Sequence, residues 1–107
     1  MLQSPINTLQ QLMAITAEEC GELTQVCMKI LRKYDTVDGI DDTKWNEKLI
    51  EELGDVYCMM DLLLEYGMVD EEAIYNRAQV KRAKLARWST LVQDTPELKQ
   101  LRESDGS

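Results

Sequence analysis

The chain has 107 residues, of which 44% are hydrophobic and 30% are charged, and it contains only five glycines and two prolines. This length supports one domain with a modest core, and the scarcity of helix breakers favours an all-α fold. The net charge of -8 argues against binding nucleic acid through a basic surface. The absence of histidine excludes Ser-His and Cys-His catalysis, most zinc sites and the Glu-x-x-His di-iron pattern.

Composition also bears on where the protein works. The three cysteines form no Cys-x-x-Cys pair, so neither a disulfide framework nor a thiolate metal site is expected. The chain opens without a charged and apolar leader, and its longest apolar run is too short to span a bilayer. We therefore expect a cytoplasmic protein with no membrane partner, whose chemistry depends on carboxylates, lysines and arginines.

The first predicted helix begins at Ser4-Pro5, because serine caps helices and proline suits the first helical position, and it extends to about Lys33. At about 100° per residue, its apolar residues form one stripe that includes Thr16. Glu19 falls near the middle of this stripe and Glu22 at its edge, whereas a solvated acidic face would lie opposite. The members of the stripe are Leu12, Ile15, Thr16, Leu23, Val26, Cys27 and Ile30.

Residues 34–42 form a turn-prone acidic loop, and the second predicted helix follows from Thr43 to Tyr66, ending before Gly67. Further apolar residues outside its main stripe make this helix apolar on most sides, which requires several neighbouring helices. We therefore expect a homodimer or homotetramer, with a small monomeric bundle as the alternative. The main stripe contains Trp45, Leu49, Leu53, Val56, Met60 and Leu63.

A third helix is predicted from Glu71 to about Trp88, with Asp70 as its cap, and its second half is rich in lysine and arginine. The tail from about residue 94 is expected to be peripheral, with a short helix that starts at Thr95-Pro96. The predicted protomer is one domain over residues 1–107, an antiparallel bundle of three main helices plus a short C-terminal helix. Oligomerisation would complete a four-helix-bundle core.

Two acidic windows are the strongest chemical signal in the sequence. In each window two acids three residues apart share a helical face. Ionised carboxylates beside an apolar stripe repel one another, and no lysine lies within residues 17–26 or 51–64. A divalent cation held by oxygens from both helices would stabilise them, whereas the alternative is a solvated acidic surface. The windows contain Glu18, Glu19 and Glu22, and then Glu51, Glu52 and Asp55.

The pattern Glu18-Glu19-x-x-Glu22, followed by Glu52-x-x-Asp55, resembles the signature of the MazG-like all-α nucleoside triphosphate pyrophosphohydrolases, over roughly residues 13–88. The resemblance implies that Glu19, Glu22, Glu52 and Asp55 ligate Mg²⁺, or alternatively Mn²⁺. It also makes Glu18 the candidate general base. Members of the family cleave nucleoside triphosphates to a monophosphate and pyrophosphate, clear unwanted nucleotides, and form dimers or tetramers.

A triphosphate that approaches a negatively charged protein needs local positive charge. Lys81, Lys84 and Arg87 share a face of the third predicted helix and are predicted to bind phosphate, as a basic segment of the family does, although basic residues also suit a helix C-terminus. Trp45 is a candidate for stacking on the base, with a core position as the alternative. Glu51 is expected to face solvent. Two other functions stay open, a non-catalytic dimerisation or interaction module and a nucleotide sensor.

Overall fold

The structure is a computed structural model that describes residues 7–33 and 43–105. Every regular element in these ranges is a helix, which confirms the all-α fold class. The contacts divide the chain into two units, Met1–Tyr66 and Gly67–Ser107. The prediction of one domain over residues 1–107 stays a prediction. No helix within the described ranges is long and apolar enough to cross a membrane.

Helix α1 spans Thr8–Lys33 and begins with a reciprocal cap. The backbone N–H of Gln10 donates to Asn7 Oδ1 at 2.8 Å, and the backbone N–H of Asn7 donates to Gln10 Oε1 at 2.9 Å. Two backbone donors that no helical carbonyl can reach are thereby satisfied. The predicted start at Ser4-Pro5 lies outside the described residues. The end of the helix at Lys33 agrees with the prediction.

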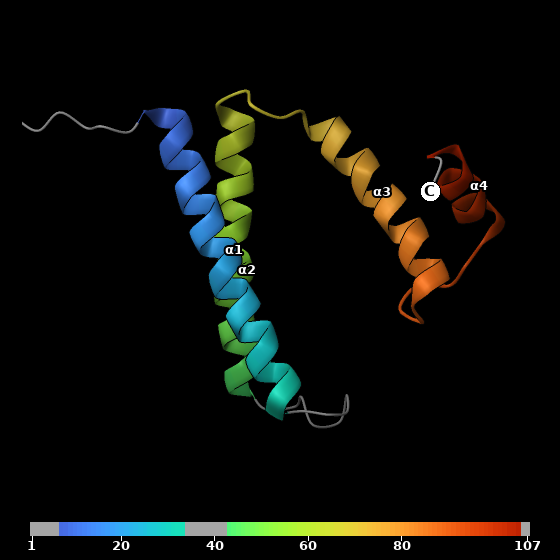
Figure 1. Ribbon diagram of the computed structural model, residues 1–107, viewed down its shortest axis with the longest axis horizontal. Helices are drawn as coiled ribbons and strands as arrows, with labels where there is room; N and C mark the ends of the chain where they lie inside the picture. Colours follow the sequence, from blue (N-terminus) through green and yellow to red (C-terminus); the bar gives the residue numbers. More distant parts are fainter. Residues whose placement is uncertain (1–6, 34–42, 106–107) are drawn as a thin grey trace, which may run out of the picture. The chain divides into compact units, whose positions relative to one another are not determined.

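Helix α2 spans Thr43–Glu65 and runs antiparallel to α1, beside it (Figure 1). Gly67 follows it with a φ of 71°, a left-handed conformation that glycine adopts without strain and that commonly ends a helix. The backbone N–H of Tyr66 donates to Leu62 O at 2.9 Å and closes the last turn. The predicted bounds of the second helix are therefore confirmed to within one residue.

The seam between α1 and α2 holds the core of the first unit. Leu12 and Val26 on α1 and Met59 on α2 are buried in it. The predicted stripe of α2 also includes Leu53, but the structure leaves this residue 48% exposed. Leu53 shares an exposed apolar face of α2 with Ile50 and Tyr57, because positions 50, 53 and 57 follow the helical repeat. We call these three residues the outer stripe.

The second unit pairs α3, Glu71–Trp88, with α4, Pro96–Ser104. Each helix has its predicted cap, since Asp70 accepts from the backbone N–H of Ala73 and Thr95 from that of Leu98. A buried arginine of α4, Arg102, ties the two helices together. One of its nitrogens, Nη1, donates to Ala83 O at 2.7 Å, and its guanidinium meets both carboxylate oxygens of Asp94 at 3.3 Å.

Candidate metal centre

Four carboxylates meet across the α1–α2 seam, and we call them the acidic cluster. Each of the residues Glu19, Glu22, Glu52 and Asp55 offers one oxygen, and these oxygens all lie within 4.8 Å of one another. The spacing of three residues places each pair on one face of its helix, and the antiparallel packing brings the two faces together. The structure therefore gathers the four residues that the sequence predicts as ligands, and their binding of a metal stays a prediction.

The deeper members of the acidic cluster are only partly satisfied by the described residues. Glu52 is only 4% exposed and Glu19 is half-buried. The Oε2 atom of each is buried and has no hydrogen-bond partner among the described residues. An unpaired buried carboxylate oxygen is costly, because it has lost its contacts with water and gained none in return. Such oxygens are suited to a ligand that supplies positive charge.

Electrostatic repulsion within the acidic cluster also favours the binding of positive charge. Burial raises the pKa of Glu19 above its ordinary value, and the negative charges of its three neighbours in the cluster raise the pKa further. A hydrogen bond with Asp55 adds to this effect by favouring the protonated form of Glu19. Without a cation, Glu19 therefore holds its proton to a higher pH than an isolated glutamate does.

The donor set fits a hard divalent cation. All four donors are carboxylate oxygens, which Mg²⁺ and Ca²⁺ prefer over nitrogen or sulfur. Oxygens on opposite sides of such an ion are separated by about 4 to 5 Å, twice the metal–oxygen distance. The separation of at most 4.8 Å within the acidic cluster is compatible with a single coordination sphere.

Lys48 is a neighbour of the site that the sequence interpretation misses. Its Nζ lies 3.2 Å from Glu52 Oε1 and 2.9 Å from Glu51 Oε2. The hydrogen bond with Glu51 is the main cause that raises the pKa of Lys48. The signal was present one turn before the second acidic window, because a lysine four residues ahead of a glutamate faces it on a helix. One lysine leaves the second oxygen of Glu52 unpaired.

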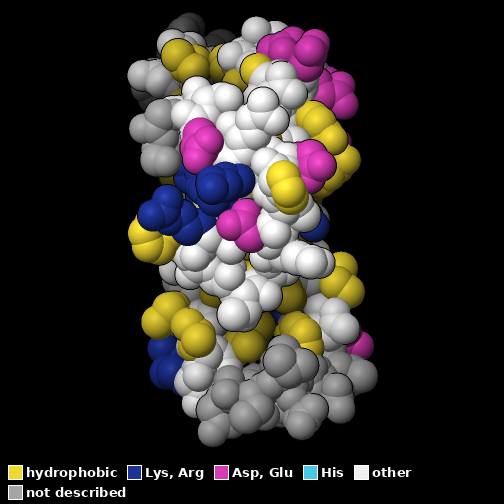
Figure 2. Space-filling model, turned by 90° about the vertical axis from the view of Figure 1, so that its right-hand side faces the viewer, with side chains coloured by type: hydrophobic (Ala, Val, Ile, Leu, Met, Phe, Trp, Pro, Cys, Tyr) yellow, Lys and Arg dark blue, Asp and Glu magenta, His cyan; other side chains and the backbone are white. Residues whose placement is uncertain are grey.

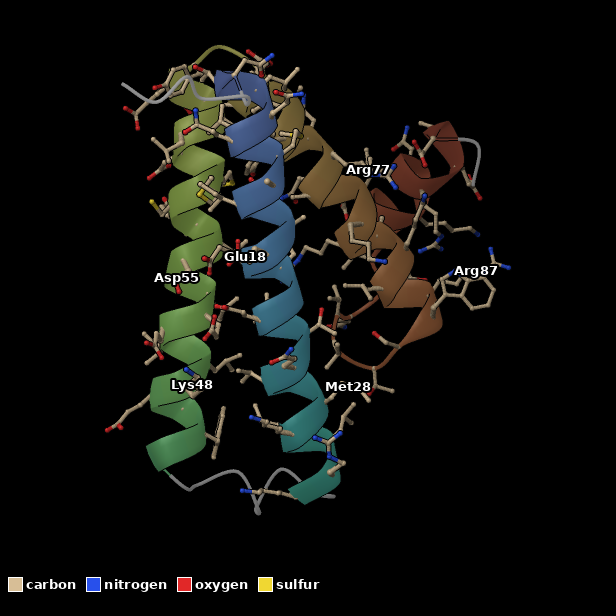
Figure 3. The ribbon with its side chains drawn as sticks, turned by 60° about the vertical axis from the view of Figure 1, so that its left-hand side comes forward. Glu18, Met28, Lys48, Asp55, Arg77 and Arg87 are labelled. Atoms are coloured by element: carbon tan, nitrogen blue, oxygen red, sulfur yellow. The ribbon has the colours of Figure 1, made fainter. Side chains whose placement is uncertain are left out.

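The other predicted residues of the first unit lie around this centre. Glu18 is exposed on α1, at about the level of Asp55 on α2, while Lys48 lies nearer the start of α2 (Figure 3). Glu51 is exposed, as predicted. Trp45 is half-buried, and its ring nitrogen Nε1 is buried without a hydrogen-bond partner in the described part of the chain. The roles of Glu18 as base and of Trp45 in stacking stay predictions.

The predicted phosphate-binding residues belong to α3, in the second unit. Lys84 is half-buried and its Nζ lies 3.2 Å from Asp105 Oδ2, an oxygen that Arg77 also approaches. Arg87 is exposed and its guanidinium lies 5.1 Å from the ring centre of Trp88. Lys81 is exposed, and the described residues offer it no ion pair. Figure 2 shows lysine and arginine side chains gathered on one face with acidic side chains among them.

Comparison with known proteins adds no assignment. No protein-family model, no curated protein and no solved structure matches this chain. The resemblance to the MazG-like family, and the activity that it implies, are therefore carried by the residues of this chain alone.

Proposed function

We propose that the protein is a Mg²⁺-dependent nucleotide pyrophosphohydrolase that cleaves nucleoside triphosphates, with ribose or deoxyribose, between the α and β phosphates. The observation that carries the proposal is the acidic cluster, in which two helices bring four carboxylate oxygens within 4.8 Å of one another and leave buried oxygens unpaired. A non-catalytic interaction surface has no need of buried and repelling carboxylates.

In the proposed reaction, water attacks the α phosphorus, the bond from this atom to the bridging oxygen breaks, and pyrophosphate leaves. When bound, Mg²⁺ would offset the charge of the phosphates and polarise the phosphoryl group under attack. Glu19, Glu22, Glu52 and Asp55 would hold the ion. Glu18, exposed beside Glu19, accepts the proton of the attacking water.

Positive side chains are also required, because the chain has a net charge of -8. Lys81, Lys84 and Arg87 are proposed to contact the phosphates. Lys81 and Arg87 are exposed, whereas Lys84 is half-buried and already paired with Asp105. The products would be a nucleoside monophosphate and pyrophosphate, and the proposed role is the removal of unwanted nucleotides in the cytoplasm.

We also propose that the protein works as a homodimer or homotetramer. The outer stripe supports this assembly, because Ile50, Leu53 and Tyr57 are 64%, 48% and 61% exposed. Three large apolar side chains side by side on a helix are typical of a surface that another helix covers.

The decisive experiment is an assay with a panel of nucleoside triphosphates and deoxynucleoside triphosphates in the presence of Mg²⁺, with the products identified. We expect monophosphate and pyrophosphate from at least one of them, and a loss of about 100-fold or more in kcat/KM for Glu52→Gln. Glu51→Gln is the matched control, because Glu51 is the exposed neighbour, and its activity should stay within about twofold of wild type. The absence of product from every nucleotide would contradict the proposal.

A further inference from the structure

A hollow of about 220 Å³ lies at the end of the hairpin where α1 begins and α2 ends. Its buried members are Leu12 and Met59, while Ile15 and Tyr66 form part of an exposed rim. Most of the lining residues are apolar, and Thr8 and Gln11 supply polar groups. The lining residues are Thr8, Gln11, Leu12, Ile15, Met59, Leu62 and Tyr66.

The hollow adjoins the acidic cluster along both helices. Ile15 lies one turn before Glu19 on α1, and Met59 lies one turn after Asp55 on α2, so each pair shares a helical face. The same two helices therefore supply the hollow and the carboxylates as neighbouring parts of one surface. At 100° per residue, Glu18 and Glu22 lie on the same side of α1 as Ile15.

The size and chemistry of the hollow define what it can receive. A cavity of about 150 Å³ accommodates a benzene ring, so a hollow of about 220 Å³ has room for one aromatic ring system and part of a substituent. An apolar floor with a few polar groups at the rim is typical of small-molecule sites. Tyr66 offers an aromatic ring and Thr8 a hydroxyl to such a ligand.

We propose that this hollow binds the nucleobase of the nucleotide whose phosphates lie at the acidic cluster. This inference rests on the proposed function, because the phosphates are placed through the metal that the carboxylates hold. The base lies over Leu12 and Met59 beside the ring of Tyr66, and the sugar bridges the short step along α1 from Ile15 to the cluster. Affinity for the base then depends on α1 and α2 alone.

The test uses a variant that fills the hollow and a matched control on the same helix. Ile15→Trp adds bulk at the rim, where the wild-type side chain is 42% exposed and folding is spared. Met13→Trp places the same side chain at a site of similar exposure, 46%, that does not line the hollow. Turnover of a nucleoside triphosphate is compared with that of methyl triphosphate, which has the same anhydride bond and no base.

We expect Ile15→Trp to raise KM for the nucleotide about tenfold or more, the size of effect that loss of base stacking produces. Its turnover of methyl triphosphate and all activities of Met13→Trp should stay near those of wild type. Equal turnover of the two substrates by the wild type, or identical behaviour of the two variants, would overturn the proposed base site while leaving the proposed hydrolase intact.

A second measurement is independent of catalysis. The side-chain methyl signals of Ile15, Leu62 and Met59 are followed by NMR during titration of the intact protein with adenosine, guanosine, cytidine, uridine and thymidine, without metal. Shifts in these signals, with Met28 unmoved, support the base site even if no triphosphate is cleaved. If no nucleoside shifts them, or if Ile15→Trp instead changes the sedimentation coefficient because a second copy covers the hollow, the proposal is wrong.

Discussion

The two units of the chain treat their charged groups in opposite ways. In the second unit, buried Arg102 has partners for its charge, since Ala83 O and both oxygens of Asp94 accept from it. In the first unit, four carboxylates converge, and Glu52 keeps a buried oxygen without a partner although Lys48 pairs with the other one. Both arrangements bury charge, but among the described residues only the buried charge of Arg102 has partners for its polar atoms, whereas the acidic cluster keeps a buried oxygen unpaired.

A buried charge that has its partners and one that lacks them have different physical consequences. A satisfied ion pair fixes the position of one helix on another, and its charges need no ligand. Carboxylates that repel one another destabilise the fold, and such local conflict is expected where a site binds something from solution. The contrast predicts that the two units respond to metal, to substitution and to pH with different signs.

The largest expected effect is that of the metal itself. Mg²⁺ at 100 times its Kd should raise the free energy of unfolding by about 2.7 kcal/mol, because it binds the folded acidic cluster and not the unfolded chain. Thermal unfolding with increasing Mg²⁺ measures this rise. The double variant Glu19→Gln/Glu52→Gln should show no rise, and a wild-type protein indifferent to Mg²⁺ would remove the contrast between the units.

The next effect belongs to the second unit. Arg102→Met should lower the free energy of unfolding by about 2 kcal/mol, because it leaves Ala83 O and the Asp94 carboxylate without their partner. Urea unfolding measures the loss, and Lys99→Met, an exposed change on the same helix, should cost no more than about 0.5 kcal/mol. Mg²⁺ should stabilise Arg102→Met as much as it stabilises wild type. A loss no greater than that of the control would show that the pair is dispensable.

The smallest expected effect is a gain in stability on substitution, whereas Arg102→Met is expected to cause a loss. Without metal at neutral pH, Glu19→Gln should shift the urea midpoint upward, because it removes one of the repelling charges. The pKa of Glu19 is raised from its ordinary value of 4.5, so its folded state holds a proton more tightly than its unfolded state. The tighter binding of this proton stabilises the folded wild type. The stabilisation is present in full below pH 4.5 and is lost as the pH rises through the raised pKa.

The comparison between wild type and Glu19→Gln isolates the effect of the Glu19 charge on the free energy of unfolding. The two proteins should differ little below pH 4.5, where Glu19 is protonated in both states, and most at neutral pH. A metal-free Glu19→Gln variant that is less stable than wild type at neutral pH would mean that the acidic cluster is not under electrostatic strain.

Local signals in the sequence were sufficient for the helices and for the residues of the acidic cluster. Asp70, Thr95 and Gly67 mark helix boundaries through bonds and dihedral angles within a few residues. The spacing of three residues within each acidic pair decides which carboxylates share a face. These features depend on the geometry of one helix and therefore need no knowledge of its neighbours.

Features that depend on packing between helices were not predictable in the same way. The tie from Arg102 to Ala83 joins residues 19 positions apart, and no short-range pattern indicates it. Leu53 was placed in the main stripe of α2, but the single chain leaves it 48% exposed, because α2 is apolar on most sides and its periodicity defines no single face. The hollow likewise depends on how α1 and α2 pack together, because both helices line it.

The raised pKa of Glu19, caused by burial and by its acidic neighbours, links the acidic cluster to the pH of the surrounding solution. A proton on Glu19 and a divalent cation would compete for the same oxygens, so binding of the proposed ion would favour release of the proton. Acid and metal therefore compete for the seam between α1 and α2. Lowering the pH should therefore weaken binding of the proposed cation at a fixed concentration of metal.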